Sequence, residues 1–250
     1  MIVEERTKPD AEIRPDMLES FRKRGLTQEE LVSESILQII AGSSTTSSAL
    51  VGILLHVVSN STAYNALRKE IDEAIKADWV SRPVIQEAEF KSLPYLNAII
   101  KESMRLFSPV ISPLTKTVPP EGDTIEADGK SVFLPGGTNV IVAWGGLMLS
   151  KELFSPDPDI FRPERWLEAP VEKLALMNRT FDLNFGHGRY QCMGKTIALS
   201  ELHKVLFALF ERFDITLVNQ KKPWTTTNLR SGWVVRDLWL RIAERGDAVE

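Results

Sequence analysis

The residues with the clearest capacity for chemistry surround the single cysteine of the chain, in the segment Phe185-Gly186-His187-Gly188-Arg189-Tyr190-Gln191-Cys192-Met193-Gly194. Its glycines permit positive φ angles and the close approach of a flat ligand. We expect a helix to begin after Cys192, with unpaired N–H groups and the positive end of its dipole beside the sulfur. Both effects favour the thiolate, which is the form that binds metals. The alternative is a small buried cysteine beside a loop, which is the commoner role of a lone cysteine.

Composition narrows the classes of protein to which the chain can belong. It has 250 residues, of which 43% are hydrophobic, as in ordinary globular proteins. A net charge of -4 gives no electrostatic reason to expect nucleic acid or an anionic membrane as a partner. One cysteine excludes an intrachain disulfide, and the first residues lack the apolar stretch of a signal peptide.

A long helix is expected over residues 28–58, after the capping-box spacing of Thr27 and Glu30. Residues 36–58 are largely apolar, but small polar residues interrupt them, so we interpret the segment as a buried helix rather than a membrane span. Its middle, residues 41–46, is rich in poor helix formers. Such a stretch indicates either a closely packed neighbouring helix or a ligand.

A second helix is expected to begin at Pro94 and to carry Glu102 and Arg105, an i,i+3 pair. Taken alone, this is an ordinary surface ion pair that contributes about 0.3 kcal/mol. The other expected elements are a short helix around 17–21, a helix over 62–77, strands at 131–134 and 138–142, a mostly irregular stretch over 144–184, a helix over 197–213, and closing strands at 214–218 and 233–240.

Four motifs follow one another along the chain: the small-residue break that contains Thr45, then Glu102-x-x-Arg105, then Phe161-x-Pro163-Glu164-Arg165-Trp166, then Phe185-x-x-Gly188-x-x-x-Cys192-x-Gly194. Their order and spacing resemble the cytochrome P450 family, the haem-thiolate monooxygenases. The resemblance runs from about residue 16 to 240 and corresponds to the C-terminal half of a full-length member. The cysteine loop is most similar to fungal microsomal members of secondary metabolism, the pisatin demethylase-like group. The implied fold is mainly α with small β-sheets (α+β), the C-terminal half of the cytochrome P450 fold.

The resemblance implies roles for named residues. Cys192 would be the metal ligand, with its thiolate bound axially to the iron of heme b. Glu102, Arg105 and Arg165 would form a buried charge network behind the cysteine loop. Thr45 and Ser44 would be the catalytic pair that orders proton delivery on the opposite side of the haem. The remaining cofactor-binding residues would be Phe185, Gly186, Arg189, Tyr190, Gly194, Lys116, Ala41 and Gly42.

Three of these positions depart from the family pattern. Ser44 stands where the family usually has an acid, and a hydroxyl is a poor proton source. Tyr190 stands where an arginine usually precedes the cysteine by two residues, with Arg189 displaced by one. Lys116 stands where the family usually offers an arginine to a propionate, and a lysine lacks the forked geometry.

The implied activity is insertion of one oxygen atom from O₂ into a small lipophilic substrate, with electrons from NADPH through a separate reductase. A second hypothesis is a truncated, catalytically inactive module that binds haem or a protein partner. A third is isomerisation or dehydration of a peroxide, against which Thr45 argues. A missing N-terminal half would leave an apolar face for a partner to cover.

The family also implies attachment to the endoplasmic reticulum membrane through an N-terminal anchor, although we expect no anchor, signal peptide or transmembrane helix in this chain. The expected organisation is a leading segment over residues 1–26 and a truncated haem domain over residues 27–250.

Overall fold

The structure of the chain is a computed structural model that describes residues 2–8, 10–111, 115–228 and 233–246. By its internal contacts the chain divides into two compact units, Met1–Ser47 and Ser48–Glu250, which are described separately below. The boundary expected between residues 26 and 27 stays a prediction.

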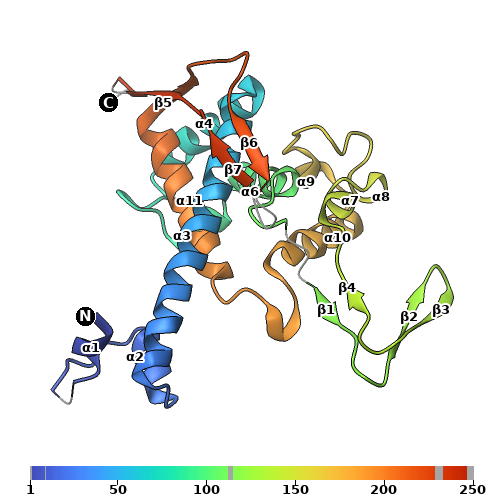
Figure 1. Ribbon diagram of the computed structural model, residues 1–250. Coiled ribbons are helices and arrows are strands. Elements are labelled where there is room, and N and C mark those ends of the chain that lie inside the picture. Colours follow the sequence, from blue (N-terminus) through green and yellow to red (C-terminus); the bar gives the residue numbers. More distant parts are fainter. Residues whose placement is uncertain (1, 9, 112–114, 229–232, 247–250) are drawn as a thin grey trace. The chain divides into compact units, whose positions relative to one another are not determined.

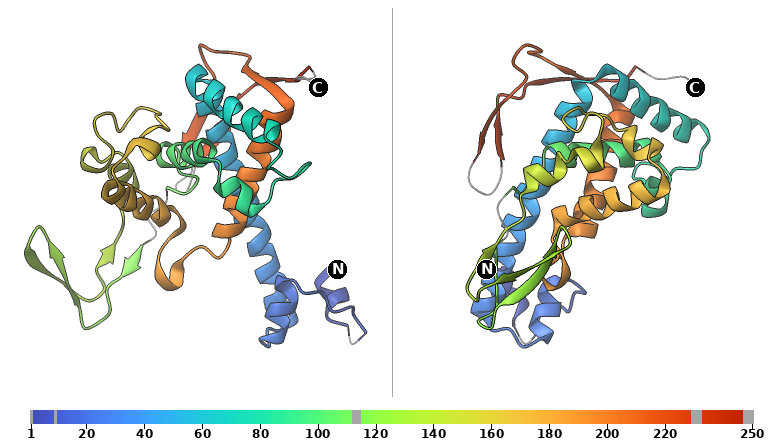
Figure 2. Two further views of the ribbon diagram at one scale, coloured as in Figure 1. Left: turned by 180° about the vertical axis from the view of Figure 1, so that it is seen from behind. Right: turned by 90° about the vertical axis from the view of Figure 1, so that its right-hand side faces the viewer.

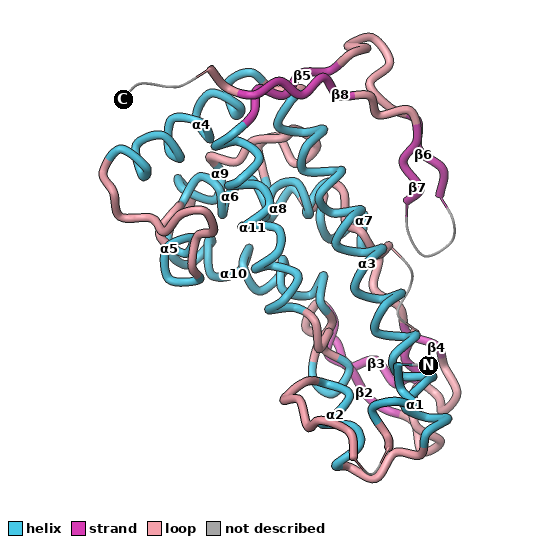
Figure 3. The backbone as a smooth tube through the Cα atoms, turned by 90° about the vertical axis from the view of Figure 1, so that its left-hand side faces the viewer, coloured by secondary structure: helices cyan, strands magenta, loops and turns pink. Residues whose placement is uncertain are grey.

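Helices supply most of the described structure, as the colours of Figure 3 show. They are α1 (Ile2–Arg6), α2 (Met17–Lys23), α3 (Gln28–Val58), α4 (Ser61–Lys76), α5 (Glu87–Lys91), α6 (Pro94–Leu106), α7 (Trp144–Met148), α8 (Lys151–Phe154), α9 (Arg165–Glu168), α10 (Val171–Asp182) and α11 (Lys195–Arg212), with the 3-10 turns η1 (Leu183–Phe185) and η2 (Gly188–Tyr190). The prediction of a mainly α chain with small sheets is confirmed.

The described strands pair two by two and antiparallel. The pairs are β1 (Lys116–Thr117) with β4 (Asn139–Val140), β2 (Asp123–Ala127) with β3 (Lys130–Leu134), β5 (Phe213–Leu217) with β8 (Leu240–Glu244), and β6 (Thr225–Asn228) with β7 (Trp233–Arg236). In the first pair Lys116 lies opposite Val140. The strand expected over 138–142 is shorter than predicted, because only two of its residues find partners on β1.

Helix α3 has the predicted bounds and begins with the predicted capping box. Thr27 N donates to Glu30 Oε2 at 2.7 Å, and Glu30 N donates to Thr27 Oγ1 at 3.3 Å. By length and composition α3 is able to cross a membrane, but core helices of soluble proteins meet the same criteria. The expected absence of a transmembrane helix therefore stays a prediction.

The interpretation of α3 as a buried helix is wrong for its first half. Its later residues Ala49, Ile53 and Val57 are buried, whereas Ile39 and Ile40 are 69% and 60% exposed. Successive residues of a helix point to different sides, so a run of neighbouring apolar residues cannot all lie on one packed face.

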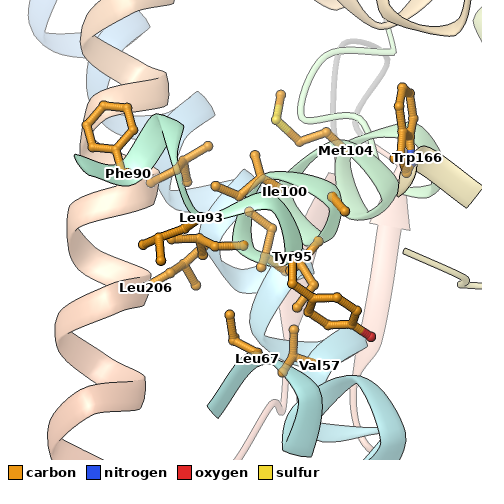
Figure 4. Close-up of a cluster of buried hydrophobic side chains, with 14 of the residues drawn as sticks. Val57, Leu67, Phe90, Leu93, Tyr95, Ile100, Met104, Trp166 and Leu206 are labelled. Carbon is orange, nitrogen blue, oxygen red and sulfur yellow. The ribbon is translucent and has the colours of Figure 1, made fainter. Parts of the chain in front are cut away.

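The core of the second unit lies where α6 packs between α4 and α11. Buried apolar residues recur at helical spacing, as with Leu67 and Ile71 on α4. Figure 4 shows Leu93 and Leu206 at one end of this cluster, Trp166 at the other and Ile100 between them. Helix α6 therefore lies at the centre of this unit, with both of its ends fixed by the core.

The start of α6 is capped by another helix. Pro94 occupies its first turn, as predicted, and has no N–H to satisfy. The carboxylate of Glu70 on α4 accepts hydrogen bonds from Tyr95 N at 2.7 Å and Leu96 N at 2.8 Å. A carboxylate at this position satisfies unpaired amides and matches the positive end of the helix dipole.

The expectation of a mostly irregular stretch over 144–184 is wrong for its last part, which forms α10. Pro170 is the N-cap of this helix and not an interior breaker. Behind it, Leu174, Met177 and Phe181 repeat at helical spacing, and the last two are buried. The shorter helices α7, α8 and α9 divide the rest of the stretch.

Candidate functional site

A buried ion network joins α6 to the start of α9. Arg105 Nε and one of its terminal nitrogens donate to the two carboxylate oxygens of Glu102 at 2.9 and 2.8 Å. Arg165 Nε donates to Glu102 Oε1 at 2.9 Å, from a position 63 residues further along the chain. The structure thus brings together the three residues of the predicted network, and Figure 1 shows α6 and α9 side by side.

The arginines of this network also organise the irregular segment around them. Arg105 donates to the carbonyls of Met148 at 2.7 Å and Pro158 at 2.5 Å. Arg165 donates to the carbonyls of Phe154 at 2.6 Å and Asp157 at 2.8 Å. Carbonyls at the end of α7 and on both sides of the turn after α8 are therefore satisfied by two guanidinium groups.

Burial separates this network from a surface ion pair. The exposed fractions are 0% for Glu102, 2% for Arg105 and 4% for Arg165. Burial alone would raise the pKa of Glu102, but hydrogen bonds and charge from Arg105, with Arg162 and Arg165, lower that pKa below its ordinary value. Glu102 is therefore held as a carboxylate, and each charge has its counter-charge within the core.

Trp166 is a further partner of Glu102 that the sequence interpretation missed. Its indole Nε1 donates to Glu102 Oε2 at 2.9 Å, and the backbone N of Arg162 donates to Oε1 at 3.0 Å. With the arginine bonds, the carboxylate accepts five hydrogen bonds. The available signal was position, because Trp166 directly follows Arg165 in the quoted motif.

The cysteine loop joins α10 to α11 and is the long orange turn in Figures 1 and 2. Cys192 N donates to Phe185 O at 2.6 Å, which closes the loop on itself. Gly186 has a φ of +74°, and a Cβ there would lie 2.7 Å from Tyr190 O. Only glycine fits this position without strain, so the turn that presents Cys192 depends on Gly186.

The thiol of Cys192 is exposed. This excludes the alternative of a small buried cysteine. Helix α11 begins three residues later at Lys195, with Gly194 as its N-cap. Large apolar side chains within five residues of Cys192 along the chain are also exposed: Tyr190 by 56%, Met193 by 66% and Ile197 by 57%. This surface is one that a flat apolar ligand would cover.

Two cations gather on the ring of Tyr190. Lys116 Nζ lies 3.4 Å from the ring centroid, and the Arg189 guanidinium lies 4.8 Å from it. Arg189 also donates to the Tyr190 hydroxyl at 2.8 Å. The structure therefore brings together the three residues expected to replace the family's usual arginines at the propionates, and cation–π attraction holds the positive charges next to the loop.

Ala41, Gly42, Ser44 and Thr45 lie on α3 in the first unit. The hydroxyl of Thr45 donates to Ala41 O at 2.8 Å, and that of Ser44 donates to Ile40 O at 3.0 Å. A Cβ on Gly42 would meet no described atom within 4 Å. Their position opposite Cys192 stays a prediction.

The cysteine loop fits a haem. Among the residues that the structure describes, no three His, Cys, Asp or Glu side chains gather to hold a metal. A porphyrin would bring its own ring-nitrogen ligands to an iron held by Cys192. The exposed thiol, the apolar surface around it and the cations on Tyr190 match the iron, the ring and the carboxylates of such a group.

Comparison with known proteins identifies the class. The family model described as Cytochrome P450 matches residues 1–238, and the chain therefore belongs to that family. The resemblance inferred from the four motifs is confirmed.

The relatives refine this placement. The chain is 41% identical to the cytochrome P450 monooxygenase ABA1 of Pyricularia oryzae over 244 aligned residues. The alignment covers 98% of this chain and 47% of that protein. It is 36% identical to pisatin demethylase of Fusarium vanettenii over 203 aligned residues. That alignment covers 81% of this chain and 37% of the demethylase. The chain thus spans about half the length of the curated relatives it matches, and the predicted similarity to fungal members is confirmed.

A solved structure agrees on the fold. The crystal structure of the cytochrome P450 CYP102L1 superposes with a TM-score of 0.77 at 22% identity, over 98% of this chain and 54% of that one.

Proposed function

We propose that the chain carries the thiolate half of a haem monooxygenase that oxidises a small lipophilic substrate in fungal-type secondary metabolism. The observation that supports this most directly is the exposed thiol of Cys192, on a loop that its own backbone closes. When bound through a thiolate, haem supplies activation of O₂ with electrons from a reductase, here NADPH-dependent.

The other proposed roles belong to separate groups of residues in the chain. Cys192 would provide the axial ligand, while Phe185, Gly186 and Gly194 shape the loop that presents it. Lys116 and Arg189, held on Tyr190, would bind the carboxylates of the haem. Glu102, Arg105 and Arg165 would fix the segment behind the loop. The hydroxyls of Thr45 and Ser44 would direct protons to the haem, and the small residues Ala41 and Gly42 would allow their helix to approach it.

The spectrum of the reduced chain with CO tests this proposal. We expect a strongly red-shifted Soret band that is lost in Cys192→Ser. His187 is the matched control, because it is an exposed alternative ligand in the same loop; His187→Ala should keep the band. A histidine-type spectrum, or no haem signal, in the unmodified chain would contradict the proposal.

A haem-binding or interaction module without turnover is the second candidate. It is favoured by the hydroxyls of Ser44 and Thr45, because both donate their protons to carbonyls of their own helix. Adding reductase, NADPH, O₂ and lipophilic test substrates separates the two candidates. Substrate-dependent oxidation by the chain excludes the inactive module, whereas a red-shifted CO spectrum without oxidation supports it.

Membership of the family also supports a proposal for the location of the protein in the cell. Members of this family are commonly membrane-associated, and we propose the endoplasmic reticulum membrane for the whole protein.

A further inference from the structure

A row of buried aromatic rings leads from the ion network to the cysteine loop. It begins at Trp166, which bonds Glu102. The ring of Trp166 meets that of Phe181 edge to face, with centroids 6.1 Å apart at 78°. Phe181 meets Phe185 in the same way, at 6.0 Å and 69°. The exposed fraction is 4% for Trp166, 4% for Phe181 and 9% for Phe185.

Phe185 connects this row to the backbone of the loop. Its carbonyl accepts the hydrogen bond from Cys192 N that closes the loop. Next to it, the side chain of Asn184 donates to Phe181 O at 2.9 Å, which ties η1 to the end of α10. A shift of Phe181 would therefore move the acceptor on which Cys192 depends.

Edge-to-face contacts are directional, because the positive edge of one ring faces the negative face of the next. In a closely packed interior such contacts fix the ring positions as well as filling space. The row thus extends the rigidity of the ion network to the loop that carries the exposed Cys192.

We propose that Trp166 and Phe181 are positioning residues for Cys192, which act through Phe185 on the backbone of the cysteine loop. This inference rests on the proposed function only in taking Cys192 as the haem ligand. The competing explanation is that both rings contribute to the core without any specific effect on the loop.

Phe154 provides the matched control. It is also a buried phenylalanine against Trp166, with ring centroids 6.0 Å apart at 50°. Among the described ring pairs, it is not part of the row that reaches Phe185. Phe154→Leu and Phe181→Leu therefore remove the same ring atoms from two different ring contacts of one tryptophan.

Amide hydrogen exchange of the 250-residue chain without haem measures the loop directly. In Phe181→Leu we expect the exchange rate of the Cys192 amide to rise on the order of 10-fold beyond any global change, because local opening no longer needs global unfolding. In Phe154→Leu the rate should change only with global stability, which urea unfolding measures separately. Trp166→Phe, which keeps a ring but loses the donor to Glu102, should give an intermediate rate.

Equal rate increases in Phe181→Leu and Phe154→Leu, after correction for stability, would overturn the proposal. If Phe181→Leu does not fold, Phe181→Met replaces it, since methionine fills a similar volume without an aromatic face; an unchanged Cys192 rate in that variant would overturn the proposal as well.

A second readout uses haem. In the reduced CO complex, Phe181→Leu should lower the red-shifted share of the Soret absorption relative to Phe154→Leu. A chain that binds no haem through Cys192 contradicts the proposed function and leaves the exchange result standing, so the two failures are distinguishable.

Discussion

The two ends of the aromatic row are built in opposite ways. At one end, Glu102, Arg105 and Arg165 are buried and their charged groups find partners within the chain. At the other end, Cys192, Met193 and Ile197 present a thiol and apolar side chains to solvent. The first region satisfies its charges within the chain, whereas the second leaves exposed the surface on which we propose that haem binds.

This difference matches the roles that we propose for the two regions. A buried charge is costly unless its partners are fixed beside it, so the network stabilises the fold only if every member is present. A ligand atom has to stay accessible and gains nothing from internal partners. We therefore expect substitutions in the network to change stability, and substitutions at the thiol to change binding.

The largest expected effect tests the completeness of the network. Glu102→Gln keeps the shape of the side chain but removes the charge shared by Arg105 and Arg165. Because two buried guanidinium groups then lose their common counter-charge, the free energy of unfolding should fall by about 3–5 kcal/mol. Urea unfolding followed by circular dichroism measures this change.

The control is a glutamate on the surface that pairs with a lysine. Glu87 and Lys91 lie 2.7 Å apart on α5, with more than half of each side chain exposed. Glu87→Gln should leave the free energy of unfolding close to that of the unmodified chain, because solvent screens an exposed pair. Similar losses in the two variants would mean that burial of the network adds nothing to its effect.

The second prediction concerns pH and a histidine beside the network. His56 stacks on Phe161 with centroids 5.0 Å apart, and its Nδ1 has no hydrogen-bond partner among the described residues. Burial lowers the pKa of His56 to about 4; the Glu102 charge partly opposes this shift, and the Arg105 charge adds to it. The native state therefore holds the neutral imidazole.

The direction in which stability changes with pH follows from proton binding to His56. Between pH 6.5 and about 4 the unfolded chain binds a proton at His56 and the folded chain does not. The contribution of His56 is thus fully present above the unfolded pKa and is lost as pH falls, by up to about 3 kcal/mol at pH 4. His56→Leu should have a shallower pH dependence of stability over this range, measured by urea unfolding at several pH values.

The third prediction compares two glycines of α3. A Cβ on Gly52 would stand 2.6 Å from Phe107 Cδ1, whereas a Cβ on Gly42 would meet no described atom within 4 Å. Gly52→Ala should therefore destabilise the chain by about 1–2 kcal/mol, the strain of overpacking less the gain in helix propensity. Gly42→Ala should be neutral or stabilise by up to about 1 kcal/mol. Denaturant midpoints measure both, and a stabilised Gly52→Ala variant would contradict the contact.

These glycines also show where sequence reasoning ends. The run of small residues over 41–46 directs attention to Gly42, because local composition is what a sequence displays. The tight contact lies at Gly52, and it depends on Phe107, which is 55 residues away. No local pattern encodes that distance.

The network shows the same limit. Spacing alone identified Glu102 and Arg105 as an ion pair, and the long helices α3, α4 and α6 followed from their periodicity. Arg165 was assigned to the same network only through the resemblance to the cytochrome P450 family. Trp166 was not predicted as a partner of Glu102, because tertiary packing decides which acceptor an indole N–H meets. Helix α10 was not predicted, although a proline such as Pro170 at a helix start is compatible with a helix.

The smallest expected effect on stability completes the comparison. Cys192→Ser changes one exposed atom on a loop whose closing hydrogen bond uses only backbone groups. Without haem, the free energy of unfolding should therefore stay within about 0.5 kcal/mol of the unmodified chain, as for other exposed substitutions. Urea unfolding of the haem-free chain measures this value, and the same two proteins titrated with haem show whether the red-shifted CO band is lost. A stability loss as large as that of Glu102→Gln would mean that the thiol is a packed structural group, and the two ends of the row would then not differ in the way their burial indicates.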